Sequence, residues 1–175
     1  MEVIELRLPG LKLIKPKVFK DDRGFFIESY NEERYHQNGI TTHFVQDNHS
    51  CSQKHTIRGM HFQTTPGQAK LIRVAQGVIY DVAVDIRPDS PTFGQWEAVT
   101  LNGEEHHQLL VPIGFAHGFC VLSDTAHVLY KTSSVYSAAT EKGFRWDDPS
   151  IGILWPTNTP IVSERDLKAP LFKEI

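Results

Sequence analysis

Apolar and polar residues alternate along most of this chain, in short runs separated by Gly, Pro, Asn and Asp. A period of two is typical of β-strands with one buried face. Short strands joined by such turns predict one all-β domain over residues 1–175, an antiparallel sandwich or jelly roll. The predicted strands are Phe25–Tyr30, His43–Asn48, Leu71–Ala75, Val78–Ile86, Gln95–Leu101, Phe119–Leu122 and Ala126–Lys131.

Only one early helix is predicted. Asn31 is a good cap for a short helix over Glu32–Asn38, which Gly39 ends. Leu6–Lys20 is expected to form short extended pieces, and Ser50–Thr56 a polar loop. From Tyr136 onward the pattern indicates loops and a tail, with a short helix or an extended cover over Leu167–Ile175.

The clearest hairpin signal is Gln76-Gly77 between the strands Leu71–Ala75 and Val78–Ile86. Pairing across that turn would make Lys70 and Asp81 diagonal neighbours on one face, where the acid would keep Lys70 charged. This face either carries a solvated salt bridge or lines a barrel. The opposite face, which includes Tyr80 and Val82, is apolar enough to pack on another sheet or on a second subunit.

The stretch Ile57–Gly77 places polar residues among apolar ones at strand spacing, and this indicates a lined pocket. Metal-binding cupins have a second His and a Glu where this chain has Gln63 and Lys70, so we expect a site without a metal. Strict alternation puts Arg58 and His61 on opposite faces of a strand. A bulge at Gly59 would bring both into the pocket. The polar residues of this stretch are Arg58, His61, Gln63, Lys70 and Arg73.

The run His43–Asn48 has two interpretations. Phe44, Gln46 and Asn48 share one face, which suits contact with a ligand. Alternatively these residues form a polar outer face and Val45 points inward.

Composition narrows the function classes. The 175 residues are 40% hydrophobic and 22% charged, with a net charge of −3, so bulk charge gives no reason to expect a nucleic-acid partner. No apolar run approaches the ~20 residues of a membrane helix. The N-terminus lacks a secretory signal, and the two cysteines, Cys51 and Cys120, are expected to be free thiols of a cytoplasmic protein.

Several motifs in fixed order resemble those of the dTDP-4-dehydrorhamnose 3,5-epimerases, which are cupin-like homodimers. The resemblance runs from about Leu11 to Leu171. It is carried by DRGFF at 22–26, FVQDN at 44–48, IRGMHFQ at 57–63, KLIRV at 70–74, YDVAVDIR at 80–87, PxGxxHGF at 112–119, WDDP at 146–149 and SERD at 163–166.

The resemblance implies a dTDP-4-keto-6-deoxy sugar as substrate, no cofactor, and proton removal and return at C3 and C5 through an enolate. His61 matches the base, Asp166 its orienting carboxylate and Tyr130 the acid on the opposite face, while Lys70 suits the enolate oxygen. His117 is expected to bond the same region or support Lys70. The other residues expected around the substrate are Phe19, Arg23, Phe26, Glu28, Gln46, Asn48, Arg58 and Asp81.

Three other functions fit parts of the pattern. One is a sibling epimerase that acts at C3 or C5 alone or isomerises the ketone. The second is a metal-dependent cupin oxygenase, and the third is a binding barrel without catalysis. The apolar face of the predicted hairpin, together with the resemblance, also predicts a homodimer in which N-terminal residues enter the neighbour's site.

Overall fold

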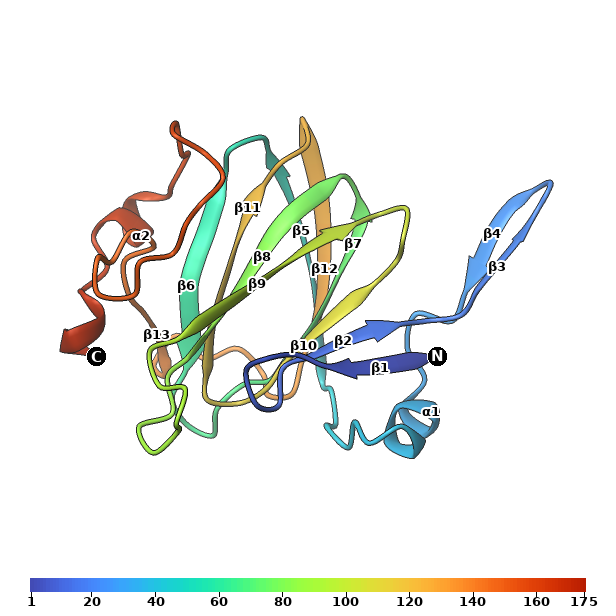
Figure 1. The fold of residues 1–175 in the computed structure, drawn as a ribbon, viewed down its shortest axis with the longest axis horizontal. Coiled ribbons are helices and arrows are strands. Elements are labelled where there is room, and N and C mark those ends of the chain that lie inside the picture. The colour runs from blue at the N-terminus through green and yellow to red at the C-terminus, as the bar shows by residue number, and fades with distance from the viewer.

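Two antiparallel β-sheets face each other in the computed structural model, which describes residues 1–175 (Figure 1). This confirms the predicted all-β architecture. The six-stranded sheet has the order β1 (Glu2–Glu5), β2 (Lys12–Lys15), β10 (Gln108–Val111), β7 (Lys70–Gln76), β12 (Thr125–Thr132) and β5 (Gln46–Gln53). The five-stranded sheet has the order β13 (Glu141–Gly143), β6 (Ile57–Gln63), β11 (Phe115–Val121), β8 (Val78–Asp85) and β9 (Trp96–Asn102).

The space between the sheets is apolar at one end and polar at the other. Ile72 and Val74 of β7 pack with Ile79 of β8 and Val128 of β12 in a fully buried cluster. Lys70, two residues before Ile72, points to the same side of β7 but lies at the polar end. The barrel is therefore filled at one end and can hold a ligand at the other.

The predicted hairpin over Leu71–Ile86 is wrong. β7 pairs with β10 and β12, whereas β8 pairs with β11 and β9 in the opposite sheet. Gly77, at φ 86°, turns the chain from one sheet to the other. Lys70 and Asp81 therefore face each other across the barrel and are not diagonal neighbours in one sheet.

Some strand bounds also differ from those predicted. β5 runs to Gln53, through part of the segment predicted as a loop, because Ser50 and Ser52 continue the inward alternation opposite β12. β11 begins at Phe115, before the predicted start. The interpretation that turned Val45 inward is wrong, since Val45 lies outside β5 and is exposed.

A segment from β13 to the C-terminus covers the outer face of the five-stranded sheet (Figure 1). Phe144, Ile151 and Trp155 pack there against Val82 and Tyr80. The apolar face predicted to meet another sheet or a second subunit is thus covered by the chain's own tail. This segment also carries α2 (Glu164–Leu167) and the short 3-10 helix η1 (Phe172–Glu174).

The helix α1 (Glu32–Gln37) confirms the prediction, with the Asn31 side chain accepting from the Arg34 amide at 3.1 Å. It packs on the outside of the six-stranded sheet, where Tyr35 and Ile40 are buried with Leu71. The preceding hairpin, β3 (Val18–Asp21) and β4 (Gly24–Ile27), pairs with no other strand and projects away from the barrel (Figure 1). No helix is long and apolar enough to cross a membrane.

Candidate active site

A cleft of about 460 Å³ opens at the polar end of the barrel. Its walls come from both sheets and from α2, and it brings together six of the predicted site residues. They are Arg58 and His61 of β6, Lys70 of β7, His117 of β11, Tyr130 of β12 and Asp166 of α2.

A bulge in β6 places both Arg58 and His61 in this cleft. His61 is opposite His117 and Arg58 is opposite Phe119, so two residues of β6 match one residue of β11 between these pairs. Gly59 adopts φ 138°, and a Cβ there would lie 2.6 Å from the Cα of Gly118. The predicted bulge is confirmed, and it depends on glycine at this position.

The first histidine–aspartate pair of the cleft joins His61 to Asp166. Asp166 Oδ1 lies 2.7 Å from His61 Nε2, and Oδ2 accepts the Gly59 amide at 3.4 Å. Burial raises the pKa of Asp166, but the hydrogen bond and charge of His61 outweigh it, and the pKa is lowered overall. Because the carboxylate engages Nε2, Nδ1 of His61 is the ring nitrogen left for a substrate.

Lys70 is buried, and its Nζ donates to the His61 carbonyl at 3.4 Å. Burial lowers the pKa of Lys70 to about 8, and the negative charges of Asp81 and Glu141 oppose that shift. The amine is therefore still largely protonated at neutral pH. A desolvated cation of this kind stabilises negative charge that develops on a nearby oxygen.

A second histidine–aspartate pair lies beside the first. His117 Nε2 is 2.8 Å from Asp81 Oδ1, and Asp81 is fully buried with Oδ2 unpaired. Asp81 lines no part of the cleft, so the prediction that it contacts the substrate is not supported; its partner His117 lines the cleft instead. Asp81 holds the His117 ring, which lines the cleft, through their hydrogen bond.

Tyr130 enters from the sheet opposite His61. Burial raises its pKa, Arg58 opposes that shift and Glu141 adds to it, so the phenol stays protonated well above neutral pH. Gln46 and Asn48, linked by a 2.9 Å hydrogen bond, line a smaller adjoining cavity with Tyr130, His61 and Lys70. The prediction that these amides face inward is confirmed, but Phe44, expected on the same face, packs with Tyr30 on the outside of the six-stranded sheet.

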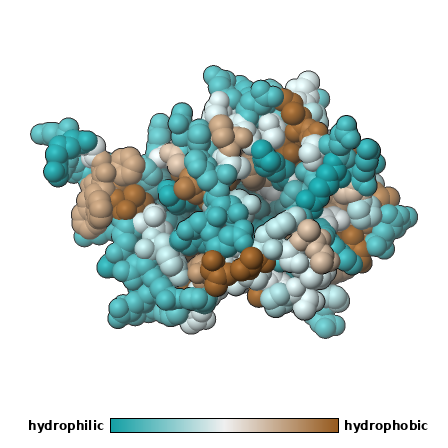
Figure 2. Space-filling view, turned by 180° about the vertical axis from the view of Figure 1, so that it is seen from behind, coloured by the Kyte–Doolittle hydropathy of each residue, from teal (hydrophilic) through white to brown (hydrophobic).

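Four of the predicted residues lie outside the cleft, on or next to the β3–β4 hairpin. Phe26 is 69% exposed, and hydrophobic residues gather on this projection in Figure 2. Arg23 pairs with Asp21 at 2.6 Å, and Glu28 pairs with Arg34 at 2.8 Å. Within one chain, Phe19, Arg23, Phe26 and Glu28 therefore do not meet the residues around His61.

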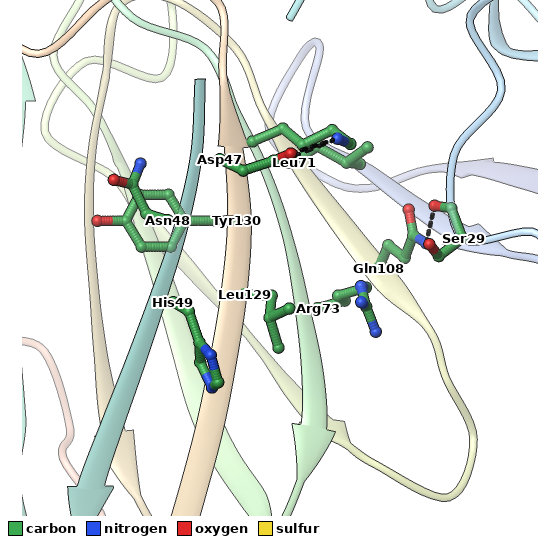
Figure 3. A pocket seen from close by; sticks show the side chains of 10 residues that line it. Ser29, Asp47, Asn48, His49, Leu71, Arg73, Gln108, Leu129 and Tyr130 are labelled. Carbon is green, nitrogen blue, oxygen red and sulfur yellow. Dashed lines mark hydrogen bonds and ion pairs between the residues drawn. The ribbon is translucent and has the colours of Figure 1, made fainter. Parts of the chain in front are cut away.

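Arg73, predicted among the pocket residues, points to the outer face of the six-stranded sheet. There it lines a separate depression of about 310 Å³ with Gln108 and Lys131. Figure 3 shows Arg73 and Gln108 on one side of β12 and Asn48 and Tyr130 on the other; residues from both groups border this depression. The alternation of β7 explains the difference, because Arg73 is an odd number of positions from Lys70.

Three residues near His61 were not predicted. Glu141 of β13 lines the cavity that holds Lys70 and Tyr130, and its side chain contacts Tyr136 and Arg165. Glu141, Tyr136 and Arg165 lie in segments whose sequence patterns indicate only loops. The spacing of Ser163 and Asp166 is a capping signal for α2, since Ser163 Oγ accepts the Asp166 amide at 3.1 Å.

No group of three or more His, Cys, Asp and Glu side chains is arranged to hold a metal ion. The nearest approach to a cupin metal set is His61, Gln63 and Lys70, of which only His61 is a metal-ligating residue type.

Comparisons with known proteins agree with this geometry. The family model for dTDP-4-dehydrorhamnose 3,5-epimerase matches residues 5–174. An enzyme of that name from Shigella flexneri is 49% identical, covering 98% of this chain and 96% of its own.

Two solved structures have the same fold. The 3,5-epimerase from Legionella pneumophila, in complex with dTDP-4-keto-L-rhamnose, has a TM-score of 0.96 and 45% identity, covering 99% of this chain and 94% of its own. The 3,5-epimerase from Bacillus anthracis, with TDP and PPi bound, has a TM-score of 0.95 and 51% identity, covering 97% of this chain and 98% of its own. The chain belongs to the dTDP-4-dehydrorhamnose 3,5-epimerase family of cupin-like isomerases.

Proposed function

We propose that His61 removes the protons at C3 and C5 of dTDP-4-dehydro-6-deoxy-D-glucose and that Tyr130 returns protons from the opposite face, giving dTDP-4-dehydro-L-rhamnose. The observation that carries this assignment is that His61 and Tyr130 come from facing sheets into one cleft, with Lys70 also in its wall. A base and an acid on opposite faces of a sugar ring are what inversion requires.

Each inversion has two balanced steps. Nδ1 of His61 takes the proton α to the C4 ketone, and the C–H electron pair forms the carbon–carbon double bond of an enolate. Lys70 stabilises the charge on O4, and Asp166 stabilises the imidazolium. The Tyr130 hydroxyl then protonates carbon, and the phenolate and imidazolium return to their starting forms by proton exchange with solvent.

Arg58 is proposed to bind the diphosphate. It stands at the rim of the cleft, where its Nε donates to Ser52 Oγ at 2.9 Å and leaves its terminal nitrogens free for phosphate oxygens. Gln46 and Asn48 supply amide groups near the sugar. His117, held by Asp81, supports the region around Lys70.

Solvent deuterium tests the assignment. In D₂O the wild-type enzyme should place label at both C3 and C5 of the dTDP-4-keto sugar, detected by NMR. His61→Ala should lower exchange at both carbons by about 10²–10⁴-fold while dTDP binding persists. Normal exchange by His61→Ala would overturn the role of His61, and label at one carbon only would favour the single-carbon sibling.

We further propose a homodimer in which the β3–β4 hairpin of one copy completes the nucleotide end of its partner's cleft. An isolated two-stranded hairpin is marginal in water, yet this one exposes Phe19, Phe25 and Phe26. A second copy would cover these rings and bring Arg23 and Glu28 to the site. Location in the cytoplasm stays a prediction.

Mixing two defective variants tests this dimer. His61→Ala lacks the base, and Arg23→Ala combined with Phe26→Ala lacks the hairpin contacts. After unfolding and refolding together, half of the dimers should be mixed, and each would hold one intact site, restoring about a quarter of wild-type activity. No restoration, in a mixture shown by light scattering and mass spectrometry to contain mixed dimers, would refute the shared site.

A further inference from the structure

The helix that carries Asp166 has little packing of its own. α2 spans four residues, Glu164–Leu167, and its one buried residue is the Asp166 carboxylate. Leu167 is 52% exposed, so no apolar side chain anchors the helix to the barrel. A carboxylate that must stay 2.7 Å from His61 Nε2 therefore needs other groups to hold the helix in place.

Glu141 joins this helix to the strand that carries His61. Its strand β13 pairs with β6, with Glu141 opposite Gln63 and Gly143 opposite His61. The Glu141 carboxylate accepts from Arg165 Nη1 at 2.8 Å. Arg165 is the residue before Asp166, so the ion pair links β13, the neighbour of the strand that carries His61, to the helix that carries Asp166.

The acid of the pair is shielded and oriented, whereas the Arg165 side chain is 56% exposed. The Glu141 side chain is 15% exposed, and Tyr136 Oη donates to its Oε2 at 2.9 Å. The Tyr136 amide in turn donates to Gln46 Oε1 at 2.9 Å, which ties the loop before β13 to β5. Burial raises the pKa of Glu141, but bonds from Arg165 and Tyr136 outweigh it and lower the pKa overall. Glu141 is thus an anion at neutral pH.

β13 lies against His61 closely enough to need a glycine. A Cβ at Gly143 would lie 2.4 Å from the Met60 carbonyl oxygen and 3.3 Å from His61 Cδ2. The strand that carries Glu141 is therefore fixed relative to the imidazole. A shift of α2 against β13 would change the distance between Asp166 and His61.

We propose that Glu141 and Arg165 are positioning residues for the epimerisation, because their ion pair holds α2 so that Asp166 stays in line with His61. This inference rests on the proposed role of His61 as the base. Misplacement of a catalytic group by about 1 Å is enough to cost about 10²-fold in rate.

A double-mutant cycle tests the pair. Glu141→Gln and Arg165→Met should each lower kcat by about 10- to 100-fold with KM changed less than about threefold. The double variant should be no slower than the slower single variant, because both remove the same interaction. Arg165→Lys should recover most of kcat, since the native contact uses one nitrogen, Nη1.

The matched control lies on the same helix. Glu164 pairs with Lys168 at 3.3 Å, with both side chains largely exposed. Glu164→Gln and Lys168→Met should leave kcat within about twofold of wild type. Multiplicative losses in the double variant, or equal kcat for Arg165→Lys and Arg165→Met, would overturn the proposal.

The same assays distinguish the positioning role of Glu141 and Arg165 from the proposed role of His61 as the base. Full activity in His61→Ala would refute the base assignment, whatever Glu141 does. Loss of activity in His61→Ala, with wild-type kcat in both Glu141→Gln and Arg165→Met, would refute the positioning role alone. A lowered Tm with unchanged kcat per folded enzyme would show that the pair only stabilises the fold.

Discussion

Replacing Asp166 by Asn tests how His61 is held and activated. The substitution keeps the volume of a residue that is 5% exposed and removes its charge. Hydrogen bonds to charged groups are worth about 1.5–3 kcal/mol. At 1.36 kcal/mol per tenfold change, losing the 2.7 Å bond to the imidazolium predicts a rate loss of about 10- to 150-fold.

The tautomer of His61 adds to this loss. An Asn amide that donates to Nε2 would leave the proton on Nδ1, the nitrogen that must accept the substrate proton. In the serine proteases the corresponding Asp-to-Asn change costs about 10⁴-fold in kcat. We therefore expect Asp166→Asn to lower deuterium exchange at both C3 and C5 by about 10²–10⁴-fold, with dTDP affinity unchanged.

Asp148→Asn is the matched control. Asp148 is 3% exposed and accepts from the amides of Phe172 at 2.7 Å and Ser150 at 2.8 Å, and it does not line the cleft. Its variant should lower Tm and leave kcat per folded enzyme near wild type. Exchange within twofold of wild type in Asp166→Asn, or an equal loss in Asp148→Asn, would refute the argued role.

Four further outcomes are expected. Tyr130→Phe should slow net inversion more than proton removal, measured as product formation against substrate exchange in D₂O; equal losses would contradict its acid role. Because Lys70 titrates at about 8, kcat should fall above that pH, and Lys70→Met should abolish this dependence. Unfolded lysine keeps its proton to about pH 10.4, so Lys70 should make the free energy of unfolding rise between pH 8 and 10.4 in denaturant titrations; a fall attributable to Lys70 would contradict its burial. Gly59→Ala should destabilise the fold by about 2 kcal/mol or more, because its Cβ would lie 2.6 Å from Gly118 Cα; wild-type stability would refute the close approach.

Alternation predicted which side chains point inward but not which strands pair. Lys70 and Asp81 both face the interior, as their spacing implies, yet they do so from opposite sheets. Gln76-Gly77 is as compatible with a crossing between sheets as with a two-residue hairpin. A local turn signal carries no information about the partner strand, which long-range packing selects.

The pairing of His61 with Asp166 could not be derived from local pattern. The two residues are 105 positions apart, and α2 is too short to give a periodic signal. Only the resemblance to a family linked them. By contrast, the bulge at Gly59 was predictable. Strict alternation would put Arg58 and His61 on opposite faces of the strand, and a glycine between them can adopt the bulge that brings both to one face.

The chemistry of Lys70 depends on its depth in the barrel as much as on its identity. Lys70, Ile72 and Val74 share the inward face of β7, and each step of two residues moves about 7 Å along the strand. Val74 is therefore in the apolar core, whereas Lys70 lies where that core gives way to the cleft. One step deeper, the amine would lose the opposing charges of Asp81 and Glu141 and become neutral. One step further out, water would restore its ordinary pKa, and its charge would be screened from an enolate. At its actual depth the amine stays charged at neutral pH and is desolvated enough to act on a substrate oxygen.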